Sequence, residues 1–452
     1  MSVPTGIGSS SQSAEVLPTT TPATAAMIDW HCIVIGAGPA GSAVAIRLAR
    51  RGLRVLLVDR SAMPRPKVCG CCLSPLARAE LAAICPPHSL SAALPLASVR
   101  LISAGQSARI RMPDGAVLSR EALDAALVRQ AIAAGADWLP NLTADAVHEP
   151  TAGRVDEPLT VVARATTSHQ QQEATRLRSR VVVIAAGLAD TIHIVQADDR
   201  GSHTGSSSRQ QMHAPRDRRV ATGSRIGVGT TLTANSSASL PAAIDLPPGE
   251  LVMAVARHGY CGLVRLEDGR LDLAAAVDRH MLAAAGGPAA GIVHLLRSAG
   301  GNGRATTAFD GSLDAVATAT FRATPPLTHH SPRIAGRSQR IFRVGDAASY
   351  VEPFTGEGIG WALASGRLLA ESLLVDGATS GPLTAGDIVA AAERYPLQHR
   401  RLFAAHHARC RWVAHGVRHP NLLSGAVQLA AALPAAAAWV LPIATGASCR
   451  QA

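Results

Sequence analysis

The chain has 452 residues and a net charge of +11; 47% of its residues are hydrophobic and 3% are aromatic. A chain of this length and hydrophobicity can bury a large core in two or three lobes, so the composition indicates a globular protein and argues against an intrinsically disordered one. Nearly all of the positive charge is arginine, and basic residues are not interleaved with aromatic ones, so we expect no nucleic-acid partner.

The first segment, residues 1–26, is rich in Ser, Thr and Pro and contains one charged residue. It lacks the basic start and apolar core of a signal peptide, so we expect a disordered tail. Eight cysteines occur without two separated CxxC pairs. This pattern predicts free thiols in a reducing, cytoplasmic compartment and no metal site.

A short apolar strand, 33–35, runs into a turn with three glycines, Gly36, Gly38 and Gly41, and then into a helix over 43–51. The first glycine permits the tight turn, the second lets the backbone approach a pyrophosphate, and the third lets the helix pack on the strand. The free N–H groups at the helix start favour an anion. We therefore interpret this stretch as a nucleotide phosphate cradle rather than a purely structural turn.

A second predicted strand, 55–58, ends at Asp59, which is followed by Arg60. A carboxylate at this place accepts hydrogen bonds from a free ribose 2′-hydroxyl and repels a 2′-phosphate. The adenosine is therefore expected to belong to FAD or NAD rather than to NADP.

The loop over 61–73 is rich in Pro, Gly and Cys and contains Lys67, the only lysine of the chain. Lysine is a compact point charge, whereas arginine is a planar fork, so a position that excludes arginine is expected to be tight and to contact an anion. A chance occurrence is the alternative.

The next predicted elements are helices over 74–84 and 119–135, the latter capped by Ser119, and strands within 99–112, 137–147, 159–166 and 180–184. Residues 190–220 are polar and without an apolar period, so we expect a mobile insertion. From 225 to about 321 the pattern predicts an antiparallel sheet with short helices near 278–285 and 291–298.

A further strand, 341–344, leads to Gly345 and Asp346, and Gly356 to Gly360 open another helix. A helix start stabilises negative charge, and the pyrimidine edge of a reduced flavin is a suitable occupant. In the last part, a basic stretch over 393–420 precedes an uncharged one over 421–449. We favour a solvated helix face followed by a buried helix; contact with an anionic membrane surface is the alternative.

Four motifs occur in one order: the glycine turn, the Pro64–Gly70 loop, the Arg120/Asp124 helix start, and Gly345-Asp346 followed by Pro353 and Gly356-x-Gly358. Together they resemble the geranylgeranyl reductase family of FAD-dependent oxidoreductases, within the p-hydroxybenzoate hydroxylase-like flavoproteins. The resemblance implies an α/β fold: a Rossmann-like FAD-binding domain with an inserted antiparallel-sheet substrate domain and a C-terminal helical segment. The expected parts are the tail 1–26, FAD-binding segments 27–95, 118–189 and 335–380, substrate segments 96–117 and 221–334, the insertion 190–220, and C-terminal helices over 381–452.

The resemblance also implies which residues hold FAD. The pyrophosphate would lie against the glycine turn, the ribose against Asp59, and the flavin ring against the Lys67 loop and the second helix start. The residues expected to bind FAD are Gly36, Gly38, Pro39, Ala40, Gly41, Asp59, Arg60, Lys67, Gly70, Arg120, Gly345, Asp346, Gly356, Gly358 and Ile359.

Two side chains are candidates for the catalytic acid, Cys69 first and Tyr260 second. A thiol near an ammonium has a stabilised thiolate, so Cys69 could give a proton to a substrate carbon or form a charge-transfer contact with the flavin; simple packing is the alternative. Tyr260 could project from the substrate sheet.

We expect an FAD-dependent oxidoreductase that reduces or dehydrogenates a carbon–carbon bond of a hydrophobic small molecule, such as a prenyl or polyketide lipid. A monooxygenase that hydroxylates an aromatic or polyketide substrate and a flavoprotein electron carrier are the alternatives. A second glycine turn of the same kind does not follow any strand, so NAD(P)H would visit the flavin transiently or be replaced by another electron donor.

Overall fold

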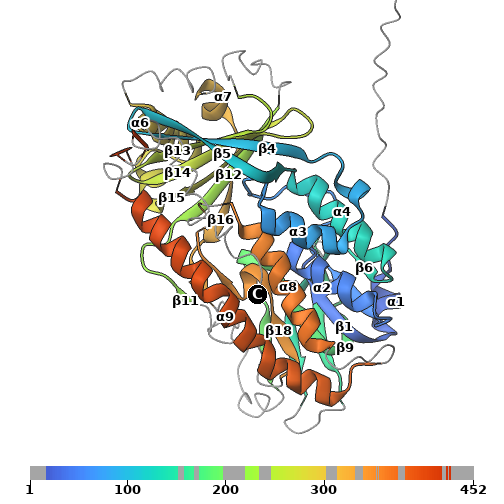
Figure 1. The fold of residues 1–452 in the computed structure, drawn as a ribbon. Helices are drawn as coiled ribbons and strands as arrows, with labels where there is room; N and C mark the ends of the chain where they lie inside the picture. The colour runs from blue at the N-terminus through green and yellow to red at the C-terminus, as the bar shows by residue number, and fades with distance from the viewer. Residues whose placement is uncertain are drawn as a thin grey trace, which may run out of the picture.

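The computed structural model describes residues 17–150, 157–166, 173–196, 219–233, 246–301, 313–330, 339–352, 354, 356–374, 382–419, 424–425 and 427–428. Two eight-stranded sheets dominate it. They lie in separate halves of the molecule, with the long helix α9 (Ala385–Val417) running beside both (Figure 1).

The first sheet carries the nucleotide motif and has the order β10-β7-β8-β9-β1-β2-β6, with β18 also paired to β9. Its parallel part comprises β1 (Asp29–Ile35), β2 (Val55–Val58), β6 (Asp137–Leu139), β9 (Thr175–Ile184) and β18 (Ile341–Arg343). The remaining strands are β7 (Leu142–Glu149), β8 (Leu159–Ala165) and β10 (His193–Gln196). The expected strands at 33–35 and 55–58 are confirmed, and their side chains are buried because helices or loops cover both faces, as is typical of parallel sheets.

Helices cover one face of this sheet: α2 (Pro39–Ala49), α3 (Pro75–Ile84), α4 (Arg120–Ala133), α8 (Gly358–Leu373) and the first half of α9. Figure 1 shows α2, α3 and α8 grouped on that face. Ser74 and Ser119 cap α3 and α4 by accepting hydrogen bonds from backbone N–H groups three residues on. Both helices therefore begin where the sequence predicts.

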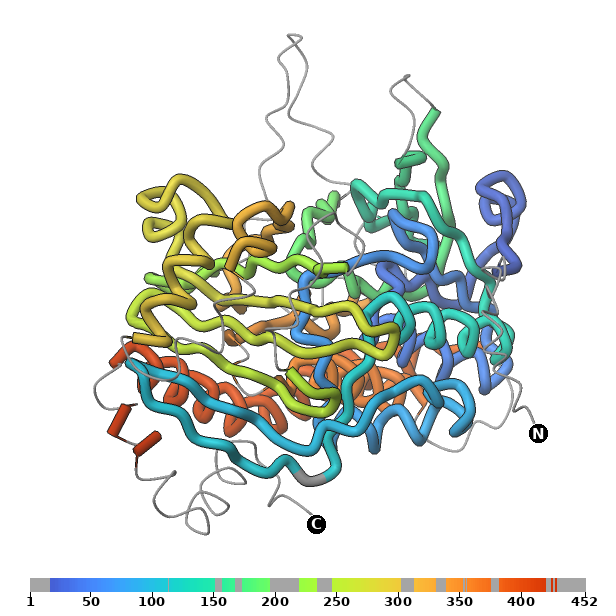
Figure 2. The backbone as a smooth tube through the Cα atoms, turned by 90° about the horizontal axis from the view of Figure 1, so that it is seen from above, coloured from blue at the N-terminus to red at the C-terminus, as the bar shows by residue number. Residues whose placement is uncertain are grey.

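The second sheet has the order β16-β12-β15-β14-β13-β4-β5-β3 and is antiparallel except where β13 pairs with β4. Its strands are β3 (Cys72–Leu73), β4 (Leu94–Ser103), β5 (Gln106–Val117), β12 (Ile226–Leu232), β13 (Glu250–Ala256), β14 (Gly259–Arg265), β15 (Leu271–Val277) and β16 (Arg322–Pro326). Three helices pack on its outer face: α5 (Arg279–Ala284), α6 (Pro288–Gly300) and α7 (Leu313–Thr318). The two views together show these helices on the side of the sheet away from α9 (Figure 2).

Strand alternation decides which side chains face the site. On β14, Cys261 and Leu263 pack into the core under the outer helices, whereas Tyr260 belongs to the cluster on the inner face. On β15, Leu271 and Leu273 also face the outer helices. Side chains alternate between the two faces of a strand, so the residue between Leu271 and Leu273 points to the inner face of the sheet, where the site lies.

The short elements are α1 (Pro22–Ala26), the 3₁₀ turns η1 (Pro87–Leu90), η2 (Gly187–Ala189) and η5 (Gly345–Ala347), and a small sheet of β11 (Arg219–Val220), β17 (His329–His330) and β19 (Ser349–Tyr350).

The predictions of a disordered tail over 1–26 and of a mobile insertion over 190–220 are each wrong for some of the residues that the structure describes. The tail prediction fails for α1, because Ala25 is fully buried there and Thr20 N donates to Trp138 O at 2.9 Å. The insertion prediction fails for β10, which pairs in parallel with β7. Residues 1–16 and 197–218 lie outside the described residues, as do Pro353 and most of the uncharged stretch 421–449. Among the described helices, none combines the length and the apolar character needed to cross a membrane.

Candidate functional site

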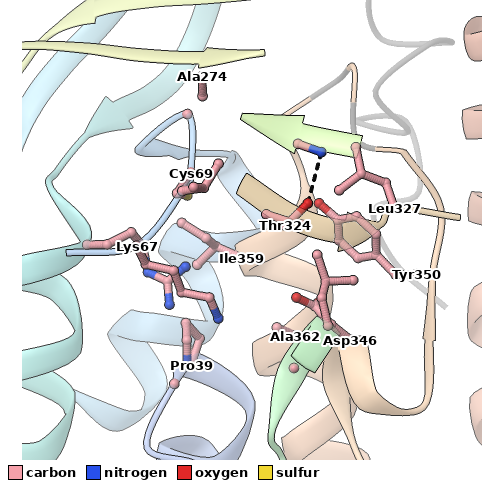
Figure 3. A pocket seen from close by; sticks show the side chains of 18 of the residues that line it. Pro39, Lys67, Cys69, Ala274, Thr324, Leu327, Asp346, Tyr350, Ile359 and Ala362 are labelled. Carbon is pink, nitrogen blue, oxygen red and sulfur yellow. Dashed lines mark hydrogen bonds between the residues drawn. The ribbon is translucent and has the colours of Figure 1, made fainter. Parts of the chain in front are cut away.

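A cavity of about 580 Å³ lies between the two halves of the molecule. Its walls come from the turn before α2, the end of β2, the loop 61–73, the start of α8 and the inner face of the second sheet. Figure 3 shows Cys69 between Ile359 and Ala274, with Lys67 directed toward Pro39; Asp346 and Tyr350 stand across the cavity. Residues from the sequence motifs are thus brought to one place.

The glycine turn is packed too tightly for side chains at two of its positions. Gly36 has φ +109°, and a Cβ there would overlap the carbonyl oxygen of Ala185. A Cβ on Gly41 would overlap the carbonyl oxygen of Gly36. At Gly38 the nearest atom to such a Cβ would be Arg120 Nη2, at 3.8 Å, so this face of the turn is open toward the cavity.

Gly38 is also the N-cap of α2 and provides no side-chain cap. The first N–H groups of an uncapped helix need an acceptor, and the helix dipole favours an anion. The residues present therefore fit a pyrophosphate at this helix start.

Asp59 is buried and its carboxylate shapes the turn. Oδ2 accepts a hydrogen bond from Ala37 N at 2.8 Å, and Oδ1 accepts one from Ser61 N at 3.0 Å. Asp59 also lines the cavity. The prediction that it meets the ribose stays a prediction, but its position at the cavity wall beside the turn is compatible with that role.

Two arginines link this carboxylate to α4. Arg120 makes two hydrogen bonds to the buried Asp124, at 2.9 and 2.8 Å. Arg65 Nη2 lies 3.3 Å from Asp59 Oδ2 and 3.6 Å from Asp124 Oδ2. Bidentate pairing fixes the Arg120 guanidinium in one orientation beside the open face of Gly38, where it can contact a phosphate.

Lys67 projects into the cavity close to η2. Its Nζ would stand 3.4 Å from a Cβ at Gly187, which has φ +69°. Desolvation lowers the pKa of Lys67, and Arg120 lowers it further, whereas Asp346 raises it. The bare face of Gly187 leaves room for the ammonium. The expectation that a compact cation is required here stays a prediction.

Cys69 and Cys71 form a compact thiol pair at the cavity wall. Cys71 N donates to Cys69 Sγ at 3.4 Å, and Cys71 Sγ donates to Cys69 O at 3.7 Å. The hydrogen bond from Cys71 lowers the pKa of Cys69 to about 6 against its desolvation, with a further contribution from Arg120. Cys69 is therefore the more acidic thiol of the pair and the favoured place for a negative charge.

The part of the cavity beside the glycine turn is called the cofactor half here, and the start of α8 forms its other side. Its N-cap, Glu357, makes no side-chain capping bond, and Gly356, Gly358 and Ile359 line the cavity. Two uncapped helix starts thus face one cavity. The structure differs from the expectation for Gly345, which does not line the cavity; a Cβ there would stand 2.7 Å from Ala40 Cβ, so this glycine permits close packing instead.

The far half of the cavity is apolar. Its lining from the second sheet includes Val99, Leu101, Ile110, Met112, Leu251, Met253, Gly262, Ala274 and Ala276. Tyr260 and Phe354 stand edge to face at 4.9 Å on its wall. The Tyr260 hydroxyl is buried without a hydrogen-bond partner among the described residues, and desolvation raises the pKa of this phenol well above its usual value.

Most predicted site residues line this one cavity. Those that do are Gly36, Gly38, Pro39, Ala40, Asp59, Arg60, Lys67, Cys69, Gly70, Arg120, Tyr260, Asp346, Gly356, Gly358 and Ile359. Gly41 and Gly345 instead lie behind it, in helix packing. Three further lining residues, Arg65, Gly187 and Tyr350, were not among the predicted site residues. Arg65 belongs to the Pro64–Gly70 motif, but in an arginine-rich chain nothing in the sequence singles out its side chain.

Comparisons with known proteins agree with this arrangement. A family model described as an NAD(P)-binding Rossmann-like domain matches residues 34–91. The menaquinone reductase of Mycobacterium tuberculosis (strain ATCC 25618 / H37Rv) is 27% identical over 354 residues, covering 75% of this chain and 76% of that protein.

Among solved structures, a triple mutant of the flavin-dependent brominase Bmp2 superposes with a TM-score of 0.67 at 16% identity, covering 92% of this chain and 94% of that one. A geranylgeranyl bacteriochlorophyll reductase-like protein from Thermoplasma acidophilum superposes with a TM-score of 0.60 at 17% identity, covering 88% and 91%. The expected fold and the resemblance to the geranylgeranyl reductase-like flavoproteins are confirmed. The chain therefore resembles FAD-dependent oxidoreductases in fold and in sequence.

Proposed function

We propose that this enzyme adds hydrogen across a carbon–carbon double bond in the prenyl chain of a lipid-soluble molecule, with prenylated quinones as the leading substrate class. The observation that carries the proposal is the apolar half of the cavity, which opens directly onto the Cys69 loop and the start of α8. An apolar wall with few polar groups suits a hydrocarbon chain better than a polar ring. The similarity to a menaquinone reductase supports the quinone class.

The chain's own residues supply binding, exclusion of water and a proton. The turn before α2, with Arg120, would hold the pyrophosphate, and the start of α8 would face the flavin ring. When bound, FAD supplies the hydride for one carbon of the double bond. Apolar side chains such as Leu101 and Met253 exclude water from the reacting carbons.

Cys69 is the proposed proton donor to the second carbon, from Sγ. Its pKa of about 6 lies close to neutral pH, where a group can both hold and release a proton during turnover. Tyr260 is the weaker candidate, because desolvation raises the pKa of its phenol and makes it a poorer acid. The proposal also includes NAD(P)H as a transient electron donor. It further includes the alternative that the C-terminal segment contacts a membrane surface.

The test uses purified holoenzyme, reduced without oxygen and mixed with a quinone that carries an unsaturated prenyl chain. After oxidation of the product in air, a reduced prenyl chain keeps the mass of two added hydrogen atoms, whereas a reduced ring returns to the starting mass. A quinone with a saturated chain is the control. A product heavier by one oxygen atom indicates the monooxygenase, and reoxidation of the flavin without any mass change indicates the electron carrier; either result overturns the proposal.

A further inference from the structure

Asp272 on β15 is a buried carboxyl group that the proposed mechanism has not used. It is 6% exposed, between Leu271 and Leu273, and its Oδ2 has no hydrogen-bond partner in the part of the chain that the structure describes. An unpaired buried carboxylate is costly, whereas a protonated carboxyl is much less so. The neighbours of Asp272 on β15 are apolar, and a hydrophobic residue at this position would cost less free energy to bury than the acid does.

The fold places this acid directly behind the thiol pair. Asp272 is the register partner of Val264 on β14, and Val264 packs in the same core cluster as Cys71. Cys71 is 3% exposed and lies close enough for its thiol to interact with the Asp272 carboxyl. Cys71 in turn donates its backbone N–H to Cys69 Sγ. Cys69, Cys71 and Asp272 therefore follow one another from the cavity wall to the inner face of β15.

The charges around Asp272 do not favour its ionised form. Desolvation raises its pKa well above the usual value, and the Cys69 thiolate and Glu121 of α4 raise it further; the Cys71 thiol and Arg270 act in the opposite direction. The Arg270 guanidinium, however, forms ion pairs with Glu121 and Asp268.

We propose that Asp272 is a positioning residue that stores a proton for the Cys69–Cys71 pair. In the resting cluster the single negative charge lies on Cys69 Sγ, while Cys71 is a thiol and Asp272 a carboxylic acid. This inference rests on the proposed function, because such a reservoir matters only if Cys69 exchanges a proton with the substrate.

Before the transfer, Cys71 Sγ passes its proton to the Cys69 thiolate and Asp272 passes its proton to Cys71, which moves the negative charge to the Asp272 carboxylate. The Cys69 S–H bond then breaks as a C–H bond forms at the substrate carbon, and Cys69 becomes a thiolate again. The Asp272 carboxylate takes one proton from water, which restores the resting cluster.

The experiment measures the carboxyl protonation directly, by infrared spectroscopy of the purified protein. At neutral pH the wild type should show a protonated-carboxyl stretching band that is lost in Asp272→Asn and retained in Asp268→Asn, a more exposed acid on the same hairpin. Cys69→Ser removes the thiolate charge, so the Asp272 band should disappear at a lower pH than in the wild type. If Asp272→Asn does not fold, this shift carries the test, with aspartate-specific isotope labelling to assign the band.

Absence of the band in the wild type, or an unchanged titration in Cys69→Ser, would overturn the reservoir. A second readout is turnover: Asp272→Asn should retain FAD and flavin reduction but lose at least tenfold in substrate reduction, and Asp272→Glu should recover part of it. If the band behaves as expected but no prenyl chain is reduced, the proposed function fails and the proton storage stands.

Discussion

The two halves of the cavity are built by different means. In the cofactor half, backbone N–H groups, three glycines and a few buried charges meet at two helix starts. In the apolar half, many side chains from strands distant in sequence each contribute a small part of the wall. One atom added to the cofactor half should therefore lower the stability or the FAD affinity strongly, whereas the apolar half should tolerate single changes.

The largest effect is expected at the glycine turn, from the pair Gly41→Ala and Gly38→Ala. At Gly41 the new methyl group overlaps the Gly36 carbonyl oxygen, so the free energy of unfolding should fall by about 3 kcal/mol. At Gly38 it meets nothing closer than 3.8 Å, so the stability should change by less than about 0.5 kcal/mol. FAD affinity should nevertheless fall at least about tenfold, because the methyl group blocks the approach of the pyrophosphate. Denaturant unfolding measures the stabilities, and FAD titration measures the affinities. Equal stabilities of Gly41→Ala and Gly38→Ala would refute the packing role of Gly41.

The next effect is expected for Asp59→Ala. The substitution removes the acceptor of the Ala37 and Ser61 N–H groups and any bond to the ribose, so FAD binding should weaken by roughly 1.5–3 kcal/mol. Equilibrium titration of the apoprotein measures this. Asp145→Ala, which removes a carboxylate paired with the exposed Arg164, is the control and should bind FAD normally. Unchanged FAD retention in Asp59→Ala would contradict the assigned role.

The reactivity of Cys69 should depend on pH between about 6 and the ordinary thiol value. Alkylation of Cys69 by iodoacetamide should be half-maximal near pH 6, whereas Cys72, whose pKa is raised by burial, should react only at high pH. Since the folded-state pKa of Cys69 is depressed, its ionisation stabilises the fold above the ordinary thiol pKa, and this contribution is lost as the pH falls through about 6. The stability gap between wild type and Cys69→Ser should therefore widen as the pH rises. A constant gap would argue that Cys69 is not a thiolate.

Lys67→Arg should weaken FAD binding by about 1 kcal/mol although the charge is kept. The planar guanidinium is larger than the ammonium that now fits the bare face of Gly187. Lys67→Met removes the charge of the side chain, whereas Lys67→Arg keeps it. FAD titration of both variants therefore separates the effect of side-chain shape from the effect of charge. Wild-type affinity in Lys67→Arg would show that the single lysine is accidental.

The smallest effect is expected in the apolar half, for Tyr260→Phe. The hydroxyl makes no hydrogen bond to the described part of the chain, so its removal should leave the stability unchanged or raise it by up to about 1 kcal/mol. Turnover should stay within about twofold, because Cys69 is the proposed acid. A large loss of turnover with normal FAD content would show that Tyr260, not Cys69, is the acid. The apolar half would then be as sensitive to a single change as the cofactor half.

Local sequence accounts for much of the cofactor half. Residues within a few positions of one another set the turn from Gly36 to Gly41, the helix caps Ser74 and Ser119, and the strand β2, which precedes Asp59. Their conformations follow from local backbone geometry and hydrogen bonding, which a single sequence displays directly.

The other contacts of the site depend on how distant segments pack together. The link from Arg65 to both Asp59 and Asp124, the room at Gly187 for Lys67, and the placement of Asp272 behind Cys71 join residues that are far apart in sequence or in unrelated elements. The register of β14 on β15 sets which side chain of each strand faces the cavity, and a shift by one residue would turn Asp272 away from the thiols. Such contacts depend on how whole strands pair and pack, so no short stretch of sequence contains them.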